Sequence, residues 1–188
     1  MNILASASPR RKELLKRILS DFEVIPADID ESVWENEAPD SYAMRMSQTK
    51  ANCLAEQYPS SLIIAADTIV ALDKKILGKP CDRKEAFEML ESYSDSHHKV
   101  LTSVSLVNNG MEKSFIVEAL VYFYPLSAQE IESYLDKNEW QDKAGAYGIQ
   151  DSASLFVKEI RGDFFTIVGL PVSRIYRELL ELGAIDQI

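Results

Sequence analysis

The fold of this chain is decided by an opening stretch, ILASASPRRKELLKRIL, that spans residues 3–19. Residues 3–5 form a short apolar run that is typical of a strand. From Arg10 onward, leucine and isoleucine side chains recur at helical spacing, which predicts a helix. Ser8 then occupies the N-cap and Pro9 the first helical position, where both residue types are favoured. The stretch therefore predicts a strand that passes directly into a helix.

Two arginines, Arg10 and Arg11, stand in the first turn of that helix. The N-terminus of a helix carries partial positive charge, which disfavours cations unless an anion lies among them. Small residues, backbone N–H groups and arginines at a strand-to-helix turn form a phosphate site. Ser6, Ser8 and Arg11 are therefore candidate phosphate-binding residues, and a solvated helix start is the alternative. The sequence contains neither a Walker A loop nor a G-x-G-x-x-G motif.

Length and composition describe a globular protein. A chain of 188 residues fits a single domain over residues 1–188, and 46% hydrophobic with 27% charged residues is typical of soluble domains. The net charge of −10 argues against a broad nucleic-acid surface, which is usually basic. It leaves room for one basic pocket, because residues 10–17 concentrate basic side chains where the phosphate site is predicted.

Cysteine, histidine and apolar patterns exclude several classes of protein. Cys53 and Cys81 form no CxxC motif, so we expect reduced thiols. His97 and His98 are adjacent, a spacing that does not direct both at one metal ion from a single strand. The sequence has no signal segment and no apolar run near the ~18 residues of a membrane span. We therefore expect a cytoplasmic protein without a zinc site and without a membrane anchor.

Helical and strand patterns are interleaved along the chain. This order predicts a mixed α/β (α+β) fold with several antiparallel hairpins and a central cleft between two lobes. Helices are expected over 10–19, 40–57 and 127–137, and two more begin after Asp82 and at Pro171. Asp82 with Glu85, and Ser127 with Glu130, form predicted capping boxes at the starts of the two helices that follow them. Strands are expected over 3–5, 23–29, 62–66, 69–72, 76–77, 99–107 and 114–124, with a hairpin of 155–160 and 164–168.

Asp67 is the sharpest candidate for chemistry. It follows the apolar run LIIAA of residues 62–66, where a carboxylate would be costly to bury without a partner. We therefore expect it to face a cleft, a metal ion or a water molecule to be activated. A strand-end aspartate that hydrogen-bonds the backbone is the alternative. The acidic residues 28–31 offer further carboxylates to a hard cation such as Mg²⁺, although acidic loops are usually solvated.

Two lysines and one small-residue segment are further candidates. Lys50 on a helix and Lys79 between glycine and proline are predicted phosphate clamps, with ordinary surface lysines as the alternative. Residues 142–150, DKAGAYGIQ, are rich in small side chains that let backbone approach a flat ligand. Within them Tyr147 can stack on a base and Gln150 offers a donor and an acceptor. A tight connection without a ligand is the alternative.

Taken together, these pieces resemble the Maf-like nucleoside triphosphate pyrophosphatases. The matches follow the expected order over nearly the whole chain, and the strings SxSPRR and DKAGAYGIQ are highly specific. The resemblance implies an elongated, two-lobed mixed α/β fold like that of inosine triphosphate pyrophosphatases. It also implies hydrolysis of a nucleotide to the monophosphate and pyrophosphate with a divalent cation, Mg²⁺ or Mn²⁺. The matching segments are residues 6–15, 66–68, 78–80, 98–102, 142–150, 162–163 and 168–171.

The resemblance also implies roles for single residues. Asp67 falls on the family's proposed proton acceptor. Arg10, Thr68 and Gln150 fall on positions that set base preference, and here they look like the branch that acts on dTTP and UTP. The branch that acts on methylated GTP carries an aromatic residue in place of Arg10.

Glu31, Lys50 and Lys79 fall near positions that hold metal or phosphates in the family. The implied metal ligands are Asp67 and Glu31, and the implied phosphate contacts include both lysines. Three positions depart from the family pattern, with Ser103 and Asp151 replacing common glycines and Ala119 replacing a common threonine. Of these, Asp151 adds charge beside Gln150.

The expected function is therefore metal-dependent hydrolysis of a small nucleotide, with no nucleic acid or membrane as partner. An alternative from another class is a non-catalytic, nucleotide-binding regulator of cell division and septum formation, in which the same pocket binds without turnover. Release of pyrophosphate separates these two functions. The pattern is compatible with a homodimer but does not decide the oligomeric state.

Overall fold

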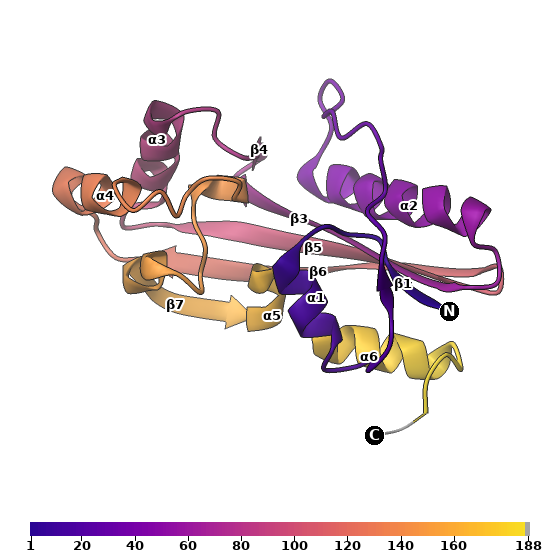
Figure 1. Cartoon of the computed structure of the whole chain (residues 1–188). Helices are drawn as coiled ribbons and strands as arrows, with labels where there is room; N and C mark the ends of the chain where they lie inside the picture. The colour runs from indigo at the N-terminus through magenta and orange to yellow at the C-terminus, as the bar shows by residue number, and fades with distance from the viewer. Residues whose placement is uncertain (187–188) are drawn as a thin grey trace. The chain divides into compact units, whose positions relative to one another are not determined.

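The computed structural model describes residues 1–186, so the last two residues of the predicted 1–188 domain lie outside the described range. Within that range a seven-stranded mixed sheet runs through the chain (Figure 1). The strands are β1 Asn2–Leu4, β2 Glu23–Val24, β3 Leu62–Leu72, β4 Lys75–Leu77, β5 His97–Asn108, β6 Met111–Phe123 and β7 Val157–Gly162. They follow the order β2-β1-β3-β5-β6-β7, with β4 paired to β3.

Both kinds of strand pairing occur in this sheet. β1 pairs in parallel with β2 and β3, whereas β3 with β4 and β6 with β7 are antiparallel. A parallel neighbour requires a crossover connection, which α1 supplies between β1 and β2. The predicted mixed α/β fold is confirmed. The helices are α1 Pro9–Leu15, α2 Pro39–Gln57, α3 Arg83–Tyr93, α4 Ala128–Leu135, α5 Phe164–Val168 and α6 Val172–Glu181, with the short 3₁₀ turns η1 Ala144–Ala146 and η2 Ser152–Phe156.

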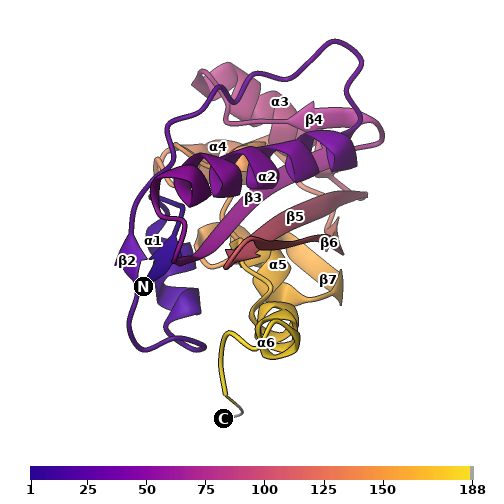
Figure 2. The same ribbon diagram turned by 90° about the vertical axis from the view of Figure 1, so that its right-hand side faces the viewer.

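The chain divides into two compact units. The first contains residues 1–67, 102–117 and the chain from Gly169 onward, and the second contains residues 68–101 and 118–168. In the first unit, α2 covers one face of the sheet and α6 lies on the other face (Figures 1 and 2). A core under α2 joins this helix to β1 and β3 through the buried residues Ile3, Ala5, Ala51, Leu54, Ile63, Ala65 and Val107.

The second unit is built around an aromatic core, with α3 packed against α4 and η1. The Tyr147 hydroxyl and His98 Nε2 form a hydrogen bond of 2.7 Å within this core, and both rings pack edge-on against Phe123. Burial lowers the pKa of His98 to about 3, so its imidazole is neutral at ordinary pH. Tyr147 is therefore not free to stack on a base, as the sequence suggested it could, because the residue is only 6% exposed.

Three predicted elements differ in the structure. β3 runs without a polar break through Asp67, because its backbone is held by β1 at one end and by β4 at the other. The strand expected over 164–168 is helix α5, since Asp163 caps it by accepting hydrogen bonds from the Thr166 backbone and hydroxyl at 2.7 and 2.8 Å. The strand expected over 23–29 is reduced to Glu23–Val24.

The other predicted helices are present, but α1 ends at Leu15 rather than at residue 19, and one cap differs. Ser8 accepts a hydrogen bond from the Arg11 backbone as expected of an N-cap, and Ser127 forms a full capping box. Asp82 caps α3, but Glu85 accepts from the Cys81 backbone rather than from Asp82, so that box is only half formed. In residues 1–186 no helix combines the length and the apolarity that a membrane crossing requires.

Candidate active site

Lys50 joins two carboxylates in the first unit. Its Nζ lies 2.7 Å from Asp67 Oδ1 and 2.7 Å from Glu31 Oε1. Lys50 extends from α2, Asp67 from the middle of β3, and Glu31 from the irregular segment 25–38. The side chains of Lys50 and Asp67 are 10% and 13% exposed, whereas that of Glu31 is 59% exposed. Three residues that were predicted separately for phosphate, catalysis and metal therefore meet at one point.

Asp67 lies at a point where the otherwise buried strand β3 is partly exposed to solvent. Along the interior of this strand, Asp67 and Thr68 alone are not fully buried, while their neighbours on both sides are. A carboxylate at that depth is costly unless a charged partner satisfies it. Lys50, which is itself buried, is that partner. Asp67 is thus a carboxylate in the middle of a strand that is paired with Lys50 and remains partly exposed to solvent.

Arg11 lies beside this cluster. Its Nε donates to the Gly169 carbonyl at 2.9 Å, and its Nη1 donates to Ser6 Oγ at 3.2 Å. The same Ser6 hydroxyl accepts from the Ser8 backbone at 3.2 Å. Burial lowers the pKa of Arg11, and the nearby charges of Asp67 and Glu31 act in the opposite direction. An arginine remains protonated under such a shift, so a positive charge is held in place at the start of α1.

The two arginines point to different surroundings, as the ~100° between successive residues of a helix requires. Arg10 is exposed, whereas Arg11 is partly buried and hydrogen-bonded. The alternative of two solvated arginines is therefore wrong for Arg11. Phosphate binding by Arg11 and base selection by Arg10 remain predictions.

The remaining predicted residues belong to the second unit. Lys79 is 65% exposed on its side chain and lies 3.8 Å from Asp142, the first residue of DKAGAYGIQ. The loop before Lys79 is tied to that segment by a 3.0 Å hydrogen bond from the Gly145 N–H to the Gly78 carbonyl. Gln150 is exposed and Thr68 is half-buried. Lys79 and the DKAGAYGIQ segment are thus neighbours, and the roles predicted for Lys79, Thr68 and Gln150 remain predictions.

Gly145 shows why this segment needs small residues. Its φ of +70° is in the left-handed region, and a Cβ there would lie 2.7 Å from the side chain of Val70. Any larger residue would be strained in backbone and would clash with β3. The small residues of DKAGAYGIQ therefore have a packing role that the sequence alone did not reveal.

Two departures from the family pattern have visible partners. Asp151 forms an ion pair with Lys143 at 3.1 Å, so its charge beside Gln150 is compensated. The hydroxyl of Ser103 hydrogen-bonds that of Ser47, and both are buried between β5 and α2. Neither departure removes a member of the Lys50 cluster.

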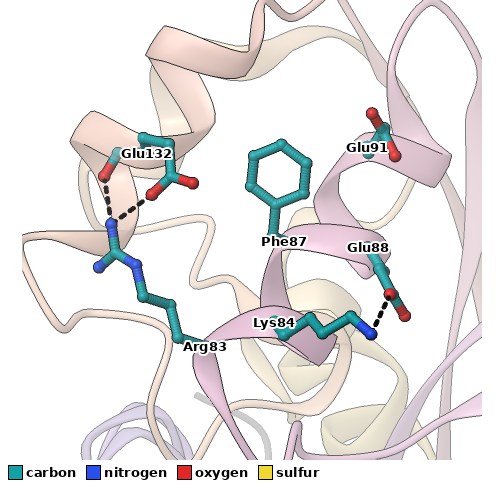
Figure 3. Close-up of a pocket in the computed structure, with 6 residues that line it drawn as sticks. All are labelled: Arg83, Lys84, Phe87, Glu88, Glu91 and Glu132. Atoms are coloured by element: carbon teal, nitrogen blue, oxygen red, sulfur yellow. Dashed lines mark hydrogen bonds and ion pairs between the residues drawn. The ribbon is translucent and has the colours of Figure 1, made fainter.

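A surface cavity of about 560 Å³ in the second unit is not part of this group (Figure 3). Its glutamates outnumber its basic residues, and Arg83 already pairs with Glu132 and Asp136. Such a lining disfavours a polyphosphate. The lining residues are Arg83, Lys84, Phe87, Glu88, Glu91 and Glu132.

The carboxylates that could hold a metal ion are Asp67 and Glu31. Among residues 1–186, no group of three or more His, Cys, Asp and Glu side chains is arranged to hold one. Mg²⁺ in nucleotide sites needs only one or two carboxylates, because phosphate oxygens and waters complete its shell. Two carboxylates that already share one cationic partner, Lys50, fit that pattern. The pair therefore suits a cation that arrives with a nucleotide.

Sequence reasoning missed two groups that shape this site. The Gly169 carbonyl fixes Arg11, and Arg45 of α2 holds the segment that carries Glu31. Neither contact produces a periodic pattern in the sequence, because each one joins a helix to a distant or irregular segment of the chain.

Comparison with known proteins gives a consistent result over nearly the whole chain. A family model described as Maf-like protein matches residues 2–182. A protein from Latilactobacillus sakei named dTTP/UTP pyrophosphatase is 48% identical over 179 residues, which cover 95% of this chain and 99% of that protein. A protein of the same name from Carboxydothermus hydrogenoformans is 50% identical over 182 residues, covering 96% of this chain and 97% of its own length.

Solved structures support the fold. The structure of a HAM1 protein from Coxiella burnetii superposes with a TM-score of 0.51 at 17% identity, and the match covers 96% of this chain and 98% of that one. At that identity the likeness concerns the fold alone. From the family model and the two close relatives, the chain belongs to the Maf family.

Proposed function

We propose that this chain hydrolyses dTTP and UTP to the nucleoside monophosphate and pyrophosphate. The observation that carries the proposal is the Lys50 cluster, in which a partly open carboxylate, a buried lysine and a second carboxylate meet beside Arg11. Such a group can bind a polyphosphate and accept a proton from water. The choice of dTTP and UTP rests on the names of relatives that are 48–50% identical over nearly the full chain.

Asp67 is the proposed proton acceptor. A water oxygen attacks the α-phosphorus, the bond from that phosphorus to the oxygen bridging to the β-phosphorus breaks, and pyrophosphate leaves. The proton of the water passes to the Asp67 carboxylate. Lys50 contacts Oδ1 of this group and orients it, so the carboxylate is held in one direction before substrate binds.

Cationic groups of the first unit are proposed to hold the phosphates. Arg11 has a fixed guanidinium at the start of α1, and Ser6 and Ser8 lie at the same strand-to-helix turn. Charge-assisted hydrogen bonds of this kind are the strong ones in phosphate recognition. Lys50 is proposed to contact a phosphate oxygen from its place between the two carboxylates. Lys79 is a further proposed phosphate contact.

A divalent cation, Mg²⁺ or Mn²⁺, is proposed as cofactor, with Asp67 and Glu31 as the residues that would hold it. When bound, it would neutralise charge that develops on the phosphate oxygens. Base preference is assigned to Arg10, Thr68 and Gln150. The amide of Gln150 can accept from the N3–H of uracil or thymine and donate to a flanking carbonyl. A cytoplasmic location is proposed, since nucleoside triphosphates are abundant there.

A screen for released pyrophosphate tests this function. Purified protein with Mg²⁺ or Mn²⁺ is given each common nucleoside triphosphate, and products are separated by ion exchange. We expect dTTP and UTP to give monophosphate and pyrophosphate, and Asp67→Asn to lose ~10²–10⁴-fold in kcat, as is typical for a lost general base. Orthophosphate and a diphosphate as products would contradict the proposal. Binding of nucleotide without turnover would favour the non-catalytic regulator.

A further inference from the structure

The segment that carries Glu31 has no regular structure of its own. It runs from residue 25 to residue 38, between β2 and α2. Irregular stretches of more than about 12–15 residues are uncommon inside compact domains and are usually functional or disordered. Glu31 itself is largely exposed, so packing around its side chain does not hold it. Something else must bring its carboxylate to Lys50.

Arg45 on α2 is the main anchor of this segment. Its Nε and Nη2 each donate to one carboxylate oxygen of Glu37 at 2.6 Å, and Nη2 also donates to the Ser32 carbonyl at 2.9 Å. The side chains of Arg45 and Glu37 are only 18% and 6% exposed. The Arg45 guanidinium lies 3.9 Å from the centre of the Trp34 ring. Three points of the segment are therefore held by one side chain.

Tyr42 adds a fourth contact from the same helix face. It lies three residues before Arg45 on α2, a spacing that places both on one side of the helix. Its hydroxyl donates to the Glu31 carbonyl at 2.8 Å. The backbone is thus fixed at Glu31 and at Ser32, and the Glu31 side chain has only to extend from this point to reach Lys50.

We infer that Arg45 is a positioning residue, which holds segment 25–38 so that the Glu31 carboxylate reaches Lys50 and Asp67. It acts through Glu31 and does not touch substrate. A lysine cannot replace it, because the two parallel hydrogen bonds to Glu37 need the forked guanidinium. The inference rests on the proposed function for its kinetic consequence, since Glu31 is there assigned to the cation site.

A double-mutant cycle tests this dependence. Arg45→Lys, Glu31→Gln and the double variant are compared by kcat/KM for dTTP and by the Mg²⁺ concentration that gives half-maximal rate. We expect Arg45→Lys to lower kcat/KM about five- to tenfold and to raise the Mg²⁺ requirement, within the range of couplings measured in one hydrogen-bond network. In the Glu31→Gln background the same change should have no further effect. An equal loss in both backgrounds would overturn the inference.

Two further variants complete the cycle. Tyr42→Phe removes only the hydroxyl that holds the Glu31 carbonyl, so it should show the same trend, more weakly, even where Arg45→Lys folds poorly. Arg161→Lys is the matched control, because Arg161 also pairs with a glutamate, Glu159, at 2.8 Å and lies over an aromatic ring, that of Tyr122. It should leave the Mg²⁺ requirement unchanged. A shift as large as that of Arg45→Lys would overturn the inference.

Tryptophan fluorescence gives a readout that does not depend on turnover. The chain has two tryptophans, and Trp34 is 61% exposed while Trp140 is 8% exposed, so a soluble quencher reports mainly on Trp34. We expect Arg45→Lys to raise the acrylamide quenching constant, because the guanidinium no longer covers one face of the indole. Unchanged quenching would overturn the inference. A wild-type protein without hydrolysis would contradict the proposed function alone, and the quenching result would still decide whether Arg45 holds the segment.

Discussion

Replacing Lys50 by methionine should destabilise the fold through one specific ion pair. Methionine keeps much of the aliphatic stem and removes the ammonium group. The contact to Asp67 is nearly buried on both sides, so a charge-assisted bond of about 1.5–3 kcal/mol is lost. The contact to Glu31 is largely exposed and contributes at most about 1 kcal/mol. We therefore expect the free energy of unfolding to fall by about 2–4 kcal/mol, which at this chain length lowers Tm by about 4–16 °C.

The assay is a set of urea and thermal melts on four proteins: wild type, Lys50→Met, Asp67→Asn and the double variant. Asparagine at position 67 carries no charge that would need a buried partner. The double variant should therefore recover part of the stability that Lys50→Met loses. We expect a coupling free energy of about 1–3 kcal/mol between the two positions. Strictly additive effects, within about 0.5 kcal/mol, would refute the reasoning that Lys50 stabilises a charge at Asp67.

Three further results are expected. Arg11→Ala should lower kcat/KM for all nucleoside triphosphates alike, by the roughly 1.5–3 kcal/mol of a lost charged hydrogen bond. Arg10→Ala should instead change the ratio of UTP to GTP turnover. Equal UTP-to-GTP ratios in the two variants would contradict this division of roles. His98 has a pKa of about 3 in the folded chain and about 6.5 in the unfolded chain, so the free energy of unfolding should fall as pH drops from about 6.5 toward 3. In melts of His98→Gln over that range, the free energy of unfolding should depend less steeply on pH. Gln150→Glu, which removes a donor, should weaken discrimination among bases by ~1–3 kcal/mol, and an unchanged ranking of kcat/KM values would argue against base reading.

Local chemistry predicted much of the fold. Ser8 and Pro9 define the start of α1 because capping needs only neighbouring residues, and the Ser127 capping box of α4 has the same origin. Composition gave the wrong secondary structure where a specific side-chain contact starts a helix. FFTIV, residues 164–168, favours a strand by composition, but the Asp163 cap starts a helix there.

The site was predicted residue by residue but not as an arrangement. Lys50 and Asp67 are 17 positions apart, and periodicity does not reveal that the two side chains meet. Asp67 was expected at a strand end, whereas β3 continues past it, because strand pairing on either side holds the backbone whatever side chain it carries. The sequence did not predict a role for Arg45, because its partners lie in an irregular segment that has no periodic pattern.

The position of the attacked phosphorus tests the central claim most directly. Hydrolysis of dTTP is run in water enriched in oxygen-18, and the products are analysed by mass spectrometry. If the water held by Asp67 attacks the α-phosphorus, one heavy oxygen appears in the monophosphate and none in pyrophosphate. Heavy oxygen in pyrophosphate would mean attack at the β-phosphorus, and heavy oxygen in orthophosphate would mean attack at the γ-phosphorus. Either of these results would contradict the proposed reaction.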